Sequence, residues 1–115
     1  PTLPIQGTPM HKTILFALVV LTVLSVGALA ANQVIHQKGR VFSSENVTIK
    51  KGDALTYVND DSIPHNIMSA TKGSEFNLGS QAPGMSTDVT FKEAGNVQVI
   101  CAIHPRMKMM VTVTE

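Results

Sequence analysis

The order of hydrophobic and polar residues divides the chain into two unlike parts. Residues 14–31 (ILFALVVLTVLSVGALAA) are apolar or small throughout. Beyond residue 31, short runs rich in β-branched residues recur, and several alternate between apolar and polar positions. Alternation with a period of two places one face of a strand in a core and the other face in water. The pattern therefore predicts an apolar leader followed by a sheet-forming domain.

Short strands are predicted throughout the second part, at residues 40–42, 46–50, 54–59, 66–69, 87–91, 97–101 and 110–114. Turn-forming residues separate them, among them Lys51-Gly52-Asp53 and Pro83-Gly84. Residues 71–84 hold three glycines and a proline, which indicates a surface loop or an irregular strand. No helical period of useful length follows residue 31. We therefore predict an all-β fold, a Greek-key β-sandwich of about seven to eight short antiparallel strands.

The apolar segment has the order of a secretory signal peptide. His11-Lys12 precede it, and Ala28-Leu29-Ala30 supplies the small-x-small pattern of a cleavage site. Met10 is the expected start, so residues 1–30 are interpreted as an upstream extension plus the signal peptide, and residues 31–115 as the mature domain. The alternative is an uncleaved membrane anchor, because eighteen apolar residues reach the lower limit of spanning length. The small residues at the far end favour cleavage.

Charge and cysteine content narrow the functional classes. The formal net charge is +1, and no basic cluster suggests binding to nucleic acid. Cys101 is the one cysteine of the chain. It has no internal disulfide partner, and a free thiol is a liability in an oxidising compartment. Cys101 is therefore either an inert buried thiol or a functional residue.

A metal-binding pattern surrounds that cysteine. Cys101, His104 and Met107 lie within seven residues, in a segment expected to form a tight loop between two strands. A thiolate, an imidazole and a thioether are the ligand types of a copper centre that alternates between Cu(I) and Cu(II). A trigonal centre needs a second imidazole, and His65, which follows Pro64 after a predicted turn, is the best candidate.

The segment YVNDDSIPHN (57–66) followed by Cys101-x-x-His104-Pro105-x-Met107 resembles the cupredoxins. The amicyanin type is more similar than plastocyanin or pseudoazurin, and the resemblance runs from about residue 41 to residue 115. It implies a cupredoxin fold and one type 1 copper ion. It also implies that the backbone N–H of Asn66 donates to the Cys101 sulfur, and that the copper ligands are His65, Cys101, His104 and Met107.

Two methionines compete for the axial position. A plastocyanin-like spacing of five residues after His104 selects Met109, whereas an amicyanin-like spacing of three selects Met107. In both families the axial methionine stands four residues before the first valine of the last strand, which here is Val111. That count predicts Met107. Met109 stays the alternative, because these families usually have glycine at its position and the departure puts the geometry of the turn in question.

The resemblance implies a monomeric, periplasmic electron carrier without stable membrane association once the signal is removed. A periplasmic dehydrogenase or a cytochrome c is the expected redox partner. The alternative is copper storage or delivery, which the surplus methionines support. A copper enzyme is disfavoured, because His36 is the one further histidine of the mature chain and is expected to be solvated. Zinc is disfavoured because methionine is a poor zinc ligand.

Overall fold

The structure is a computed structural model and describes residues 1–7, 22 and 32–115. The predicted start at Met10, the signal peptide and the cleavage site after Ala30 lie outside the described residues. Among the residues that are described, no helix is long and apolar enough to span a bilayer.

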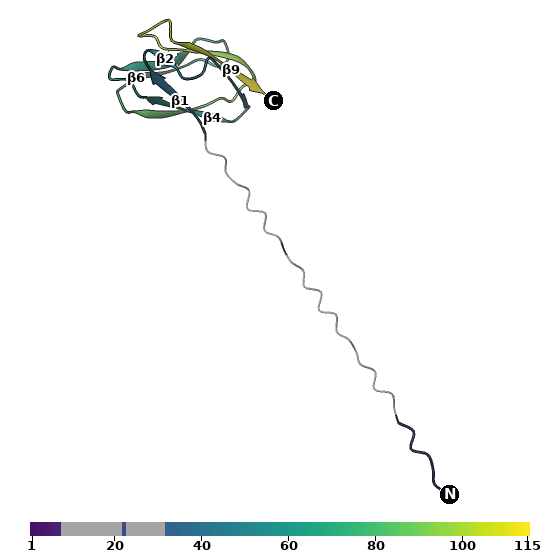
Figure 1. The fold of residues 1–115 in the computed structure, drawn as a ribbon. Coiled ribbons are helices and arrows are strands. Elements are labelled where there is room, and N and C mark those ends of the chain that lie inside the picture. The colour runs from purple at the N-terminus through teal and green to yellow at the C-terminus, as the bar shows by residue number, and fades with distance from the viewer. Residues whose placement is uncertain (8–21, 23–31) are drawn as a thin grey trace.

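The part of the chain from residue 32 onward is built from nine strands. They are β1 (Gln33–Lys38), β2 (Val41–Phe42), β3 (Asn46–Lys50), β4 (Ala54–Asn59), β5 (His65–Ser69), β6 (Phe76–Gln81), β7 (Ser86–Thr90), β8 (Gly95–Ile100) and β9 (Lys108–Thr114). One sheet has the order β2-β1-β4-β7, and the other has the order β3-β9-β8-β5-β6. The two sheets pack face to face (Figure 1), which confirms the predicted all-β sandwich.

The core lies between the two sheets and follows from the alternation in the sequence. In β4 every second residue is buried, and the same holds for most of β9. Tyr57, Leu55 and Ile35 contribute the largest side chains of the first sheet, and each is fully buried. The second sheet contributes mainly valines, including Val97, Val99 and Val111. Phe42 and Phe91 are the other buried aromatic residues, so the core is mainly aliphatic, which agrees with the low aromatic content of the sequence.

Strand β1 was not among those predicted, and β6 falls where a surface loop or an irregular strand was predicted. In β1 the buried positions include the polar Gln37, whose Nε2 donates to the side-chain Oε1 atom of Gln81 at 2.6 Å, so the apolar alternation is broken. The outer strand β6 is exposed along most of its length and contains Gly79 at a φ of 73°. Because neither strand carries a repeated apolar face, the sequence pattern gave no regular alternation there. His36 lies in β1, and its side chain is exposed, as expected.

The expected antiparallel arrangement is wrong for two strand pairs. Strand β1 runs parallel to β4, and β3 runs parallel to β9. Both pairs join segments far apart in the sequence. Since parallel strands need long connections, their pairing depends on tertiary structure and has no local sequence signal.

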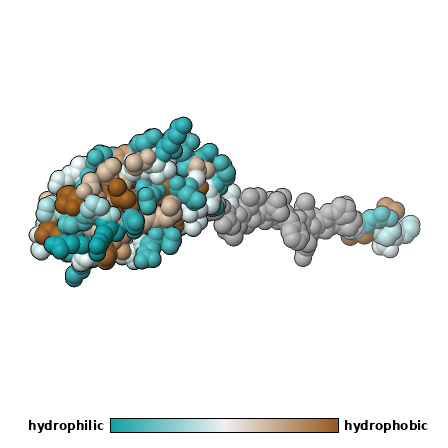
Figure 2. Space-filling view, turned by 90° about the horizontal axis from the view of Figure 1, so that it is seen from above, coloured by the Kyte–Doolittle hydropathy of each residue, from teal (hydrophilic) through white to brown (hydrophobic). Residues whose placement is uncertain are grey.

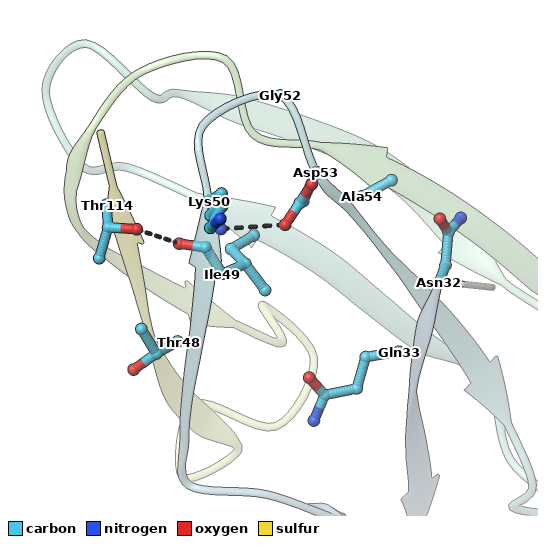
Figure 3. A pocket seen from close by; sticks show the side chains of 9 residues that line it. All are labelled: Asn32, Gln33, Thr48, Ile49, Lys50, Gly52, Asp53, Ala54 and Thr114. Carbon is cyan, nitrogen blue, oxygen red and sulfur yellow. Dashed lines mark hydrogen bonds between the residues drawn. The ribbon is translucent and has the colours of Figure 1, made fainter. Parts of the chain in front are cut away.

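The two ends of the sandwich differ in character. At one end a hollow of about 590 Å³ lies between the start of β1 and the turn that joins β3 to β4 (Figure 3). Thr114, the last residue of β9, and Ala54, the first of β4, line it. At the other end, Asn59 closes β4 and Lys108 opens β9, so the loops that carry His65 and His104 lie there. The face of the domain drawn in Figure 2 shows small, separate apolar patches among polar residues.

Candidate metal centre

A buried asparagine shapes the loop that delivers His65. Asn59 donates through Nδ2 to the carbonyl oxygens of Ile63 and Gln81, at 2.9 and 3.0 Å. Its Oδ1 accepts the backbone N–H of Asp61 at 3.0 Å. These bonds satisfy a side chain that is fully buried, and they fix the turn between β4 and β5. His65 is thereby held as the first residue of β5.

The second loop joins β8 to β9 and is held by two backbone hydrogen bonds between its own residues. The backbone N–H of Cys101 donates to the carbonyl oxygen of Met107 at 3.1 Å, and the N–H of Met107 donates to the carbonyl oxygen of His104 at 2.8 Å. Cys101 follows the end of β8 directly, and Met107 immediately precedes β9. The loop therefore has rigid ends and a short span, as the spacing in the sequence predicted.

Three donor atoms from the two loops converge. The Nδ1 atoms of His65 and His104 are 3.2 Å apart, and each lies 3.9 Å from the Sγ atom of Cys101. The point equidistant from the three atoms is about 2.1 Å from each, inside the range of about 2.0–2.3 Å for bonds from nitrogen and sulfur to a metal. The arrangement fits one ion at the centre of the triangle.

The chemistry of the donor set suits copper. His65 donates its Nε2 hydrogen to the Oδ2 atom of Asp61 at 2.6 Å, so its Nδ1 atom keeps a free lone pair directed at Cys101 and His104. Two imidazoles and one thiolate form the trigonal set found in electron-transfer copper sites. Hence these residues fit a copper ion with no rearrangement of the loops.

The three residues differ in how far they are buried. Cys101 and His65 are fully buried, whereas His104 is half-buried. The two imidazole rings meet edge to face, with centroids 5.0 Å apart. One imidazole therefore reaches the surface while the sulfur and the other imidazole are enclosed by protein.

The backbone N–H of Asn66 donates to the Cys101 sulfur at 3.2 Å, which confirms the bond that the resemblance implied. The side chain of Asn66 adds a second function. Its Oδ1 accepts the N–H of Ala102 at 3.2 Å, while its Nδ2 donates to Asn77 and to the carbonyl oxygen of Gly79, both at 2.8 Å. Asn66 thus ties the edge strand β6 to the loop that begins at Cys101. Sequence reasoning missed this role.

Asp61 is a second residue that the sequence reasoning missed. Besides His65, its carboxylate accepts the backbone N–H groups of Gly39 at 2.7 Å and Arg40 at 3.1 Å. The hydrogen bond from His65, helped by these two backbone donors, lowers the pKa of Asp61 from 3.8 to about 2, although partial burial acts in the opposite direction. The side chain is therefore a carboxylate at neutral pH. Its one signal in the sequence is an acid four residues before the histidine.

The two candidate axial methionines lie in different surroundings. Met109 lies on β9 and faces the core, where its sulfur accepts the hydroxyl of Tyr57 at 3.6 Å. Met107 is buried at the end of the same loop that carries Cys101 and His104. The sulfur of Met109 already has a partner away from the donor triangle, which favours Met107. Its role as a ligand stays a prediction.

Comparisons with known proteins agree with this geometry. A family model described as copper binding proteins, plastocyanin/azurin family, matches residues 30–114. Plastocyanin from Scenedesmus fuscus is 34% identical over 83 residues, covering 64% of this chain and 85% of that protein. Methylamine utilization protein MauL from Methylorubrum extorquens is 38% identical over 61 residues, or 52% of this chain, and the match spans only 54% of MauL.

Solved structures share the same architecture. A purple cupredoxin from Nitrosopumilus maritimus has 28% sequence identity and a TM-score of 0.63, covering 72% of this chain and 100% of that one. A reduced amicyanin variant has 24% identity and a TM-score of 0.67, covering 76% of this chain and 86% of that one. The second likeness supports the fold alone.

Proposed function

The chain belongs to the copper-binding plastocyanin/azurin family and takes one type 1 copper ion, and from this premise we propose that it is a one-electron carrier. Copper, when bound, accepts and releases a single electron. The observation that carries the proposal is the combination of a buried donor set with one imidazole at the surface. His65 and Cys101 are fully buried, while His104 is half-buried.

In this proposal His65, Cys101 and His104 are the three strong ligands, and Met107 is the weak axial one. The support is the convergence of two Nδ1 atoms and one Sγ atom within 3.9 Å of one another. Each of the two loops is held by hydrogen bonds that need no metal, namely those of Asn59 and those between Cys101 and Met107. Ligands that stay in place through both oxidation states favour rapid electron exchange, because little has to rearrange.

The end of the sandwich that carries His104 suits brief docking of a redox partner. We define the apolar rim as Pro64, Met85, Ile103 and Pro105, all of which are exposed. Ile103 keeps 48% and Met85 keeps 46% of its possible exposure, which is high for hydrophobic residues. A small apolar contact favours fast dissociation over tight binding. Electrons would pass through the His104 edge while the other ligands stay enclosed.

Copper storage or delivery is the competing function. Its support in the sequence was the number of methionines beyond the one needed as a copper ligand. The sulfur of Met109 accepts the Tyr57 hydroxyl in the core. The sulfur of Met85 accepts the backbone N–H of Ala82 at 3.2 Å. Two of the surplus thioethers therefore have partners within the protein, and neither belongs to the donor triangle. This arrangement favours the electron carrier.

We further propose that the protein is exported to the periplasm and receives electrons from a dehydrogenase or passes them to a cytochrome c. The apolar segment at 14–31 supports export. The amicyanin-like segment from Cys101 to Met107 supports a dehydrogenase as the donor. Intact mass of the exported protein tests the first part, and a mature chain that begins near Ala31 is expected.

The function is tested by measuring electron transfer and metal transfer side by side. The Cu(I) protein is mixed with oxidised cytochrome c in a stopped-flow instrument, and in parallel with an apo-protein that binds Cu(I). An electron carrier reduces the cytochrome rapidly and keeps its copper. Rapid loss of copper to the acceptor, with negligible reduction of the cytochrome, would show a delivery protein instead.

A further inference from the structure

The carboxylate of Asp61 joins two parts of the fold that are distant in the sequence. On one side, its Oδ2 atom accepts the Nε2 hydrogen of His65 at 2.6 Å. On the other side, its two oxygens accept the N–H groups of Gly39 and Arg40, in the turn between β1 and β2. The side chain of Asp61 is mostly shielded, with 14% exposure, and that of His65 is fully buried. The contact is therefore only weakly screened by water.

The turn between β1 and β2 presents backbone N–H groups that can bind an anion. Gly39 and Arg40 make up a two-residue hairpin loop with φ angles of 65° and 58°, as the primed hairpin turns require. Arg40 adopts this left-handed conformation although it is not glycine, which is unfavourable without compensation. Successive backbone N–H groups in such a turn make an anion-binding concavity. Asp61 occupies it and compensates for the unusual backbone.

A carboxylate held in this way acts on the imidazole that it contacts. It keeps the hydrogen of His65 on Nε2, fixes the plane of the ring and makes Nδ1 a stronger electron donor. A stronger donor favours Cu(II) over Cu(I), because the more highly charged ion gains more from it. We propose that Asp61, seated on the Gly39–Arg40 turn, is a positioning residue that lowers the reduction potential of the copper site through His65. The inference rests on the proposed function, since it takes Nδ1 of His65 as a copper ligand.

The neighbouring acid provides a matched control. Asp60 carries the same charge one residue earlier, but its Oδ2 atom pairs with Nδ1 of His36 on the exposed surface, at 2.5 Å. Asp60→Asn and Asp61→Asn therefore remove the same charge from adjacent positions. Only the second substitution changes the group that contacts His65.

The experiment compares the full chain with the variants Asp61→Asn, Asp61→Ala and Asp60→Asn. The midpoint potential is measured together with the separate affinities for Cu(I) and Cu(II). Asp61→Asn keeps a carbonyl oxygen that can accept the His65 hydrogen but removes the charge. It is expected to shift the ratio of Cu(I) to Cu(II) affinity about tenfold towards Cu(I), which raises the potential by about 59 mV for a one-electron couple. Asp60→Asn is expected to shift the ratio less than about twofold, because that charge is exposed and screened.

A readout without metal accompanies these values. In the apo-protein, the Nε2 proton of His65 is expected to give a strongly downfield NMR signal, which Asp60→Asn keeps and Asp61→Ala loses. If Asp61→Asn weakens Cu(I) and Cu(II) binding equally, Asp61 is merely structural and the inference is overturned. The same holds if its potential shift does not exceed that of Asp60→Asn. Failure of the wild-type protein to give a reversible copper couple would instead overturn the proposed function, so the two failures are distinguishable.

Discussion

The hydroxyl of Tyr57 donates to the sulfur of Met109 across 3.6 Å, in the core between the two sheets. Both side chains are buried, and a thioether is a weak acceptor, so the contact satisfies the hydroxyl at little gain in free energy. Met107, two residues earlier, precedes β9 and belongs to the loop of Cys101 and His104. The two methionines therefore have separable roles, one in the core and one at the metal centre.

Replacement of each methionine by leucine should separate these roles. Met107→Leu is expected to raise the reduction potential while the protein stays blue, because loss of a weak donor disfavours Cu(II). Met109→Leu should leave the potential nearly unchanged and lower the free energy of unfolding by about 1–2 kcal/mol, since the Tyr57 hydroxyl loses its acceptor. Voltammetry and denaturant unfolding measure both quantities. The reverse order of effects on the potential would assign the axial role to Met109.

Tyr57 predicts how the protein responds to alkali. Burial raises the pKa of its phenol well above the ordinary value of 10.0. The unfolded chain ionises this group near pH 10 and the folded chain does not, so stability is retained below that pH and falls as the pH rises above it. The slope is at most about 1.4 kcal/mol per pH unit.

Because Tyr57 is the only tyrosine and tryptophan is absent, the phenolate absorbance reports on this residue alone. It is expected to appear together with the loss of the β-sheet circular dichroism signal. Tyr57→Phe should remove the corresponding part of the alkaline loss of stability. Ionisation of Tyr57 in a chain that is still folded would refute this account.

The hydrogen bonds of the Asn59 side chain hold the loop that carries His65. Their removal is therefore expected to lower both stability and copper affinity. Asn59→Ala leaves the carbonyl oxygens of Ile63 and Gln81 without their donor. The free energy of unfolding should fall by about 1–3 kcal/mol, and copper affinity should fall as well because His65 is held less firmly. Asn96→Ala is the control, since Asn96 accepts only an exposed bond from Thr112. It should change stability by less than about 0.5 kcal/mol. Equal effects of the two substitutions would contradict the proposed role of Asn59.

A charge on the apolar rim should slow electron transfer without disturbing the metal centre. Ile103→Glu is expected to reduce the rate of electron exchange with cytochrome c about tenfold, which corresponds to about 1.4 kcal/mol in docking. Colour and copper affinity should stay unchanged, because Ile103 points to solvent. Val34→Glu on β1 is the control, since Val34 is similarly exposed but pairs with Thr56 towards the other end of the sandwich. Equal slowing by both variants would exclude docking at the rim.

Much of the sandwich could be predicted because its strands alternate in the sequence. The alternation in β4 and β9 reflects one face in the core, and the loop from Cys101 to Met107 is local enough for its spacing to be informative. Strand β1 was missed because the buried Gln37 interrupts the apolar pattern; its Nε2 donates to Oε1 of Gln81, which is 44 residues away. Strand β6 was predicted only as a loop or an irregular strand, because it lies at the edge of its sheet and is mostly exposed.

The hydrogen-bond partners of the site were less predictable than its donor atoms. Cysteine and histidine at short spacing have few other uses, so Cys101 and His104 were singled out by chemistry alone. The role of Asp61 depends instead on the backbone of Gly39 and Arg40, more than twenty residues earlier. The side chain of Asn66 likewise bonds across two strands, to Asn77 and Ala102. Such contacts exist only once segments far apart in the sequence have been brought together by the fold.

The most direct test of the copper centre is the visible absorption spectrum of the purified protein during titration with Cu(II). One equivalent of copper is expected to produce an intense blue band, because charge passes from the Cys101 thiolate to the metal. Cys101→Ser should stay folded by circular dichroism and give no such band, since an alcohol cannot supply that donor. A Cys101→Ser variant that keeps the blue colour, or a wild-type protein that remains colourless, would contradict the ligand set of His65, Cys101, His104 and Met107.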